Sequence, residues 1–167
     1  ADGVDRRIDV IATAMRAGLK ATDLIDLDLA YAPPYGQAKD PVNQTGMVAH
    51  NVLTGELVLT GPDALTEDMP VLDVRTPGEY AAGHMPNSLN IPHTQLRDRL
   101  DEVRAWVDEN VGEQPFVVMC AAGVRSWIGY RIVRHAGFNV TMLSGGIQTL
   151  RAWLGEKAEA VLVKEEG

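Results

Sequence analysis

The segment CAAGVRS, at residues 120–126, contains the only cysteine in this chain of 167 residues. It follows the apolar run FVVM at residues 116–119 and precedes a run with helical periodicity that begins near Trp127. A thiol beside a helix N-terminus and an arginine is ionised more readily than a free thiol, because both carry positive charge. We therefore expect Cys120 to be the catalytic nucleophile, acting as a thiolate or as a persulfide anion.

The residues after the cysteine are predicted to form the substrate-binding loop. Their small side chains allow the backbone to curl, so that successive amide N–H groups converge on one anion. Arg125 adds a full positive charge, and Ser126 is expected to cap the following helix. The loop residues assigned to substrate binding are Ala121, Ala122, Gly123, Val124, Arg125 and Ser126.

Each of these residues also has a plain structural interpretation. A free cysteine is usually a small buried hydrophobe, which would not explain the arginine and serine placed beside Cys120. Arg125 could be a solvated surface charge. Ser126 could be a helix cap alone, and this role is compatible with a chemical one.

Composition excludes several other functions. Lysine and arginine number 15 and aspartate and glutamate 23, which gives a net charge of −8 and disfavours nucleic acid or an anionic membrane as partner. One cysteine excludes an internal disulfide framework and a multi-cysteine zinc site. We predict no metal site, since the four histidines, His50, His84, His93 and His135, lack metal-ligand spacing. No apolar run is long enough to span a membrane.

Residues 56–167 carry an alternating strand and helix pattern. Short apolar runs, typical of strands buried on both faces, occur at residues 71–74, 88–91, 116–119 and 140–143. Apolar stripes at helical spacing lie between them and after the last one, and the tail at 157–167 is expected to be a frayed helix or disordered. The pattern predicts an α/β fold with a parallel sheet and helices on both faces. Ligands of such sheets bind beyond the carboxyl ends of the strands, where Cys120 lies.

Asp73 and Arg75 follow another predicted strand and fall at the same edge of the sheet as Cys120. We expect them to form a structural ion pair that supports the loop. Glu79 is interpreted as a charge at the start of a short helix, and His84 as a turn or capping residue rather than an acid or base.

Residues 1–55 contain too few predicted helices and strands to form a convincing core of their own. Apolar residues at helical spacing from Val4 predict a helix that stops near Gly18, and alternation in LIDLDLAY predicts a strand at residues 24–31. Asp40 followed by Pro41 predicts the start of a second helix, which Gly55 ends. This region is interpreted as a helix–strand–helix piece of a neighbouring domain.

Three blocks of the C-terminal region together resemble the rhodanese family of sulfurtransferases. They are LDVRTPGEYAAGHMPNSLNIP at 72–92, CAAGVRS at 120–126 and LSGGIQTLRAW at 143–153, and the resemblance covers residues 57–155. One departure is PNS at 86–88, where the family commonly has Pro-Gly-Ala, in a turn. The resemblance implies that Cys120 accepts a sulfane sulfur as a persulfide and passes it to a nucleophile.

Residues 4–54 resemble the end of the dimerisation domain of coenzyme A-disulfide reductases, especially in the segment AYAPPYGQAKDPVN at 30–43. Tyr31 and Tyr35 match tyrosines that lie near the partner subunit's active site in that family. The resemblance implies a cytoplasmic, homodimeric parent with FAD and NAD(P)H. This chain has no Gly-x-Gly-x-x-Gly segment and is expected to bind neither cofactor.

The resemblance also implies the partners, a small sulfur donor and an external thiol acceptor such as coenzyme A. Arg125, and Arg131 further along the predicted helix, are candidates to meet the acceptor's phosphates, although Arg131 also fits a solvated helix position. Two other functions remain open. A cysteine phosphatase has a similar loop, but four residues separate Cys120 from Arg125, one fewer than in such phosphatases. A binding module without turnover would not need the cysteine.

Overall fold

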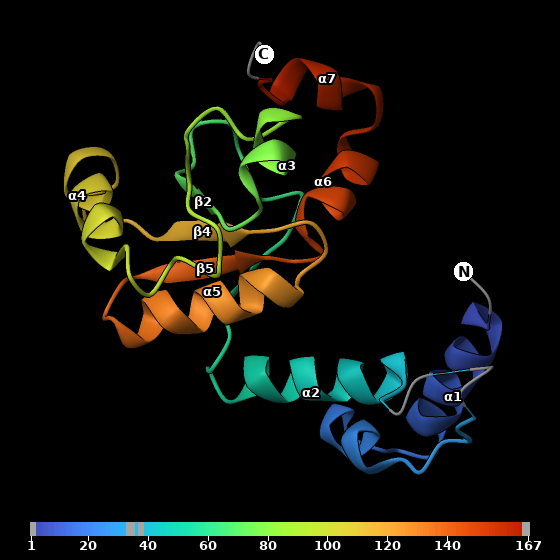
Figure 1. The fold of residues 1–167 in the computed structure, drawn as a ribbon. Coiled ribbons are helices and arrows are strands. Elements are labelled where there is room, and N and C mark those ends of the chain that lie inside the picture. Colours follow the sequence, from blue (N-terminus) through green and yellow to red (C-terminus); the bar gives the residue numbers. More distant parts are fainter. Residues whose placement is uncertain (1–2, 33–35, 37–38, 165–167) are drawn as a thin grey trace. The chain divides into compact units, whose positions relative to one another are not determined.

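The computed structural model describes residues 3–32, 36 and 39–164. The chain divides into two compact units, Ala1–Leu57 and Val58–Gly167, here called the N-terminal and C-terminal units (Figure 1). Among the described residues, no helix combines the length and the apolar composition that crossing a membrane requires.

The C-terminal unit contains a five-stranded sheet in the order β1-β5-β4-β2-β3. Its strands are β1 (Leu59–Thr60), β2 (Val71–Asp73), β3 (Ser88–Asn90), β4 (Phe116–Met119) and β5 (Val140–Leu143). All four pairings are parallel, and Asp73 lies opposite Met119 in the register of β2 and β4. Parallel pairing brings the carboxyl ends of β2 and β4 together, so residues 73–75 and the cysteine loop leave the sheet side by side.

Helices cover both faces of this sheet, as its two-sided apolar strands require. The helices are α3 (Pro77–Ala81), α4 (Leu100–Asn110), α5 (Val124–His135), α6 (Gly146–Leu154), η2 (Gly155–Lys157) and α7 (Ala158–Val161). Figure 1 shows α5 on one side of β4 and β5, with α3 and α6 on the other. The α/β class and the parallel sheet predicted from the sequence are thereby confirmed.

The two faces of the sheet are packed by alternate residues of each strand. Val71, Val117 and Met119 pack in one cluster with Ile147 of α6 and with Leu162, which follows α7. On the other face, α5 comes close to the sheet at Gly129, where an added Cβ would lie 3.1 Å from Val74 and 3.4 Å from Val118. This close approach fixes the position of α5, whose first turn carries the end of the cysteine loop.

The tail is more ordered than its sequence predicts. Residues 158–161 form α7, Ala158 and Leu162 are buried in the core, and Val163 forms a bridge with His84. The prediction of a frayed or disordered segment is therefore wrong for residues 157–164. Ala158 and Leu162 are four residues apart and share one helical face, which is enough to bury a short apolar segment.

The N-terminal unit is built from α1 (Val4–Arg16), η1 (Ala21–Asp26) and α2 (Pro41–Leu53). A small core of Ala14, Leu24 and Val42 joins them. Asp40 caps α2 as predicted, because its side chain accepts a hydrogen bond of 3.0 Å from the Val42 N–H. The assignment of this unit to a reductase dimerisation domain stays a prediction.

The strand predicted at residues 24–31 is absent, and this prediction is wrong. Residues 21–26 form a 3-10 helix, and the backbone carbonyls of Leu24, Ile25 and Leu27 accept hydrogen bonds from the Asn43 amide of α2. Burial does alternate along residues 26–29, where Leu27 and Leu29 are half-buried and the aspartates beside them are exposed. Alternation alone indicates only that a segment is half-buried. A strand also needs hydrogen bonds with a neighbouring backbone, and here the Asn43 side chain donates to those carbonyls instead.

Candidate active site

Cys120 directly follows β4, and its loop leads into α5. The backbone N–H of Gly123 donates a hydrogen bond of 3.1 Å to the Cys120 sulfur. Gly123 has φ +120°, a conformation that residues with a Cβ rarely adopt. This glycine lets the loop turn back over the sulfur, and Cys120 is only 2% exposed.

The residues of the cysteine loop differ in their exposure to solvent. Ala121 and Gly123 are half-buried, Ala122 is exposed and Val124 is 76% exposed. The sulfur thus lies at the base of a loop whose outer side is accessible. The backbone of the loop, rather than its side chains, lies against the sulfur.

Ser126 is fully buried and contacts both the cysteine and the loop. Its hydroxyl donates a hydrogen bond of 2.8 Å to the Gly123 carbonyl, and the Cys120 thiol donates one of 3.4 Å to its oxygen. The prediction that Ser126 is the N-cap of the helix is wrong, because α5 begins at Val124 with Gly123 as N-cap. Ser126 instead fixes the loop from within the first turn.

The environment of Cys120 favours its thiolate. Burial acts to raise the pKa of the thiol, but the hydrogen bond between Cys120 and the Ser126 hydroxyl and those from the backbone N–H groups of Gly123, Ser126 and Ala122 outweigh it. The pKa of Cys120 therefore lies below its ordinary value. A nucleophilic cysteine needs this property.

The N-terminus of α6 holds the cysteine loop through backbone hydrogen bonds. The N–H groups of Ile147 and Gln148 donate to the carbonyls of Cys120 and Ala121, at 2.9 and 3.1 Å. A Cβ on Gly146 would lie 2.5 Å from the Cys120 carbonyl oxygen. These contacts hold the loop carbonyls toward α6. Sequence reasoning gave Gly146 no role, although the Gly-Gly pair in LSGGIQTLRAW was a signal for a close backbone approach.

Arg125 forms a bidentate ion pair with Glu79, at N–O distances of 2.7 and 2.6 Å. The pair links the loop to α3, where Glu79 also closes a capping box with Thr76. The Arg125 guanidinium holds the pKa of the Glu79 carboxyl down at about 2. The prediction of a full positive charge at the loop is therefore corrected, because Glu79 compensates Arg125. Sequence reasoning placed Glu79 at its helix start but missed this partner.

Asp73 and Arg75 form an ion pair that is almost completely buried. The Arg75 Nε–H donates to both carboxylate oxygens of Asp73, at 3.0 and 2.9 Å. The same guanidinium donates to the carbonyls of Glu79 and Gly83, each at 2.9 Å. The pair thus holds the segment that carries Glu79, and through Glu79 it reaches Arg125.

The remaining residues singled out from the sequence are His84, Tyr31 and Tyr35. The ring of His84 stacks on Tyr80 at 3.8 Å between centroids, and its Nδ1–H donates to the Tyr80 carbonyl, as its structural interpretation requires. Tyr31 is 56% exposed, whereas Tyr35 lies outside the described residues. Within the described part of the chain, no three His, Cys, Asp or Glu side chains group as metal ligands would.

Comparison with known proteins identifies the C-terminal unit. The profile of the rhodanese-like domain family matches residues 61–152. The reduced Bacillus anthracis CoADR-RHD has a similar structure, with a TM-score of 0.84 and 36% identity over 97% of this chain and 28% of that chain. An NAD-dependent persulfide reductase from A. fulgidus has a TM-score of 0.74 and 41% identity over 87% of this chain and 25% of that chain.

A curated relative is also similar. The coenzyme A disulfide reductase of Staphylococcus haemolyticus is 46% identical over 50 residues, which are 30% of this chain and 11% of that protein. The chain thus spans only 11% of this relative and about a quarter of the two solved chains, at 28% and 25%. The chain belongs to the rhodanese-like domain family, and it closely matches the C-terminal rhodanese domain of coenzyme A disulfide reductase and NAD-dependent persulfide reductase.

Proposed function

We propose that this chain is a sulfurtransferase that moves sulfane sulfur through a persulfide on Cys120 to a small thiol. The observation that carries the proposal is the sulfur of Cys120, which receives a hydrogen bond of 3.1 Å from Gly123 and whose pKa is lowered by the loop. A set of backbone donors that favours a thiolate favours a persulfide anion for the same reason.

The reaction has two displacement steps at sulfur. In the first, the Cys120 thiolate attacks the outer sulfur of thiosulfate, the S–S bond of the donor breaks, and sulfite leaves with the bonding electrons. In the second, an acceptor thiolate attacks the outer sulfur of the Cys120 persulfide. The S–S bond to Cys120 breaks, the thiolate returns, and the acceptor leaves as a persulfide, so that the enzyme is unchanged.

The loop geometry suits a persulfide better than a bare thiolate. The Cys120 sulfur is buried, and a second sulfur bonded to it would lie about 2.05 Å further out. We expect this extension to bring the reactive atom nearer to the outer side of the loop, where Ala122 and Val124 are exposed. The first sulfur stays protected while the transferred one becomes reachable by an acceptor.

The acceptor is an external thiol, and we propose coenzyme A. The chain has no second cysteine that could resolve a persulfide internally. The names of two relatives support the choice, since one is a coenzyme A disulfide reductase and the other a persulfide reductase. In a homodimeric, cytoplasmic parent of this kind, FAD and NAD(P)H would reduce the released persulfide.

Cys120→Ser tests the proposal. Thiosulfate and cyanide serve as donor and acceptor, and thiocyanate is the product measured. Transfer is expected to disappear in the variant while the melting temperature stays close to that of the unaltered protein, because serine has nearly the same volume. Thiocyanate formation by the variant at the unaltered rate would contradict the assignment.

A further inference from the structure

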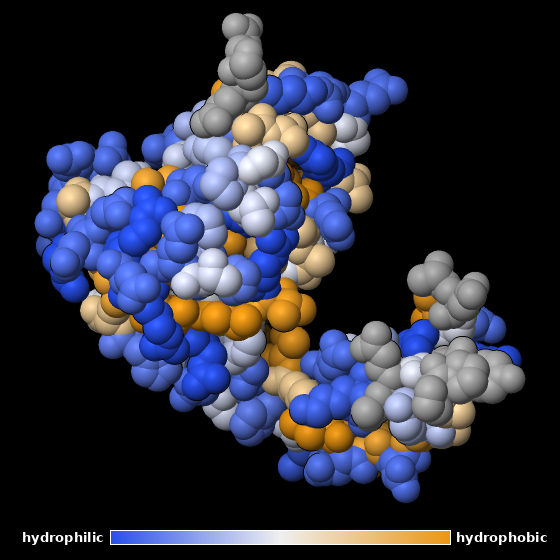
Figure 2. Space-filling model, in the orientation of Figure 1, coloured by the Kyte–Doolittle hydropathy of each residue, from blue (hydrophilic) through white to orange (hydrophobic). Residues whose placement is uncertain are grey.

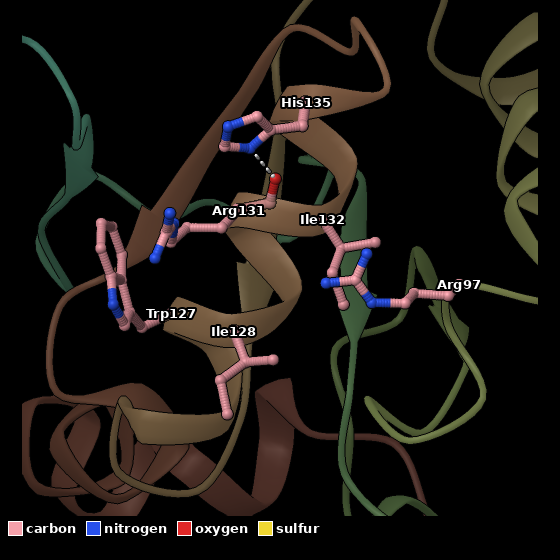
Figure 3. Close-up of a pocket in the computed structure, with 6 residues that line it drawn as sticks. All are labelled: Arg97, Trp127, Ile128, Arg131, Ile132 and His135. Carbon is pink, nitrogen blue, oxygen red and sulfur yellow. Dashed lines mark hydrogen bonds between the residues drawn. The ribbon is translucent and has the colours of Figure 1, made fainter.

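A second site lies along α5, outside the cysteine loop. A pocket of about 470 Å³ is lined by Arg97, Trp127, Ile128, Arg131, Ile132 and His135. Five of these residues come from α5, and Arg97 reaches in from the segment before α4 (Figure 3). All six belong to the C-terminal unit, so the pocket is complete within it.

The pocket carries positive charge in a protein whose net charge is −8. Arg97 and Arg131 supply two guanidinium groups, and no lining residue is acidic. His135 also lines the pocket, and its Nδ1–H donates to the Arg131 carbonyl at 2.8 Å, as Figure 3 shows. A local cluster of this sign in an acidic protein indicates an anionic ligand.

The same pocket has an apolar and aromatic part. Ile132 is buried at 8% exposure and Ile128 is 42% exposed, while the Arg131 guanidinium lies 5.6 Å from the centroid of the Trp127 ring. Figure 2 shows apolar side chains in orange over the region of α5, with hydrophilic ones beside them. A simple inorganic anion would use the arginines but not this surface.

We propose that the pocket binds a phosphorylated aromatic ligand, an adenine nucleotide. Guanidinium groups bind phosphate oxygens through paired hydrogen bonds, and the isoleucines with the Trp127 ring offer contact area to a flat base. The volume lies within the range of about 300–1,000 Å³ typical of small-molecule sites.

The position of the pocket near the cysteine loop gives the bound nucleotide a role in sulfur transfer. This role rests on the proposed function. Helix α5 starts at the cysteine loop, and Arg131 is eight residues beyond Gly123. At a rise of about 1.5 Å per residue this is about 12 Å along the helix, a distance that the flexible pantetheine arm of coenzyme A covers. The pocket would hold the nucleotide end of the acceptor while its thiol reaches Cys120.

Binding can be measured without any sulfur chemistry. Adenosine 3′,5′-bisphosphate is titrated into the protein by calorimetry, and the indole N–H signal of Trp127 is followed by NMR. The double variant Arg97→Gln/Arg131→Gln is expected to bind roughly tenfold more weakly or worse, because it loses two charge-assisted contacts. Arg104→Gln is the matched control, since Arg104 also lies over an aromatic ring, at 5.0 Å from Phe138, but outside the pocket. Its affinity should equal that of the unaltered protein.

No binding of the bisphosphate, or equal affinity in the double variant, would overturn the inference. A second readout compares the discharge of persulfide-loaded Cys120 by coenzyme A and by pantetheine, which has the same thiol without the nucleotide. The unaltered protein should prefer coenzyme A, and the double variant should lose that preference. Failure of Cys120 to load from thiosulfate would instead contradict the proposed function and leave the binding result standing.

Discussion

At the scale of single residues, the site is built around one buried sulfur and the donors that surround it. Cys120 is 2% exposed, and burial alone would keep its thiol protonated. The hydrogen bonds of Gly123 and Ser126 reverse that tendency. Arg125, the nearest full charge in the loop, is paired with Glu79. The backbone and one hydroxyl, more than the arginine, therefore prepare the nucleophile.

The pH dependence of Cys120 tests this assignment. Because the folded pKa is lowered, the rate of alkylation by iodoacetamide should reach half its maximum at a pH below 9.0, the ordinary value for the thiol. Ser126→Ala removes the hydroxyl that is hydrogen-bonded to the sulfur and should move this midpoint upward. Ser88→Ala, on an edge strand, is the control and should not move it. The single cysteine makes the measurement unambiguous, and a midpoint unchanged in Ser126→Ala would show that the hydroxyl has no electrostatic effect.

Glu79 makes a second prediction at this scale. Its folded pKa of about 2 is below the ordinary 4.5, so its stabilisation is present above pH 4.5 and is lost as the pH falls toward 2. The side chain is 38% exposed, and solvent screening limits the effect to about 0.5–1 kcal/mol. Urea unfolding at pH 6 and pH 2 should therefore show Glu79→Gln destabilised more strongly at pH 6 than at pH 2. In an Arg125→Gln background the same change should have a smaller effect that depends on pH, because only the hydrogen bonds from Thr76 still lower the pKa of Glu79.

At the scale of elements, α6 and α5 approach the cysteine loop from its two ends. α5 continues the loop, and the N-terminus of α6 holds the carbonyls of Cys120 and Ala121. The loop N–H groups are thereby left for the sulfur. This arrangement depends on Gly146, where the two backbones meet.

Gly146→Ala should damage both stability and transfer. A Cβ there would meet the Cys120 and Ala121 carbonyl oxygens at 2.5 and 2.6 Å, and its φ of +63° is unfavourable for alanine. Strain of this kind costs about 1–3 kcal/mol before the clash is added. Gly112→Ala is the control, because Gly112 has φ +67° with open space around it. Unfolding free energies and thiocyanate rates for both variants check this, and equal losses of stability with full transfer in both would show that the α6 contact is unimportant.

Sequence patterns predicted the elements of the C-terminal unit well because its central strands β2 and β4 are buried along their whole length. The runs at 71–74, 88–91, 116–119 and 140–143 each contain a strand of the sheet. Strand β1 has only two residues, which is too short for an alternating pattern of apolar and polar residues to be recognised in the sequence. The Glu79–Arg125 pair was equally invisible, because its partners are 46 residues apart and only the folded chain brings them together.

At the scale of the whole molecule, the N-terminal unit retains an uncovered apolar face. On α1, Val4, Ile8 and Met15 are 46%, 60% and 73% exposed. Figure 2 shows apolar side chains at the surface of this unit. Exposed apolar residues grouped in this way are typical of surfaces that meet another protein surface.

We expect the isolated chain to self-associate through this face. Light scattering should give a mass above the 18.1 kDa of the monomer. The double variant Ile8→Glu/Met15→Glu places charges on the apolar face and should have the mass of the monomer. Arg6→Glu/Arg16→Glu changes charge on the same helix without removing apolar residues and serves as control. A monomeric mass for the unaltered chain at high protein concentration would contradict the expectation.

The persulfide itself provides the most direct test of the account. The intact protein is incubated with thiosulfate, freed of excess donor and weighed by mass spectrometry, then treated with coenzyme A and weighed again. Thiosulfate is expected to add one sulfur atom, located on Cys120 by peptide mapping, and coenzyme A is expected to remove it. A mass unchanged by thiosulfate, with Cys120 still alkylatable, would contradict the central claim that this loop carries sulfur.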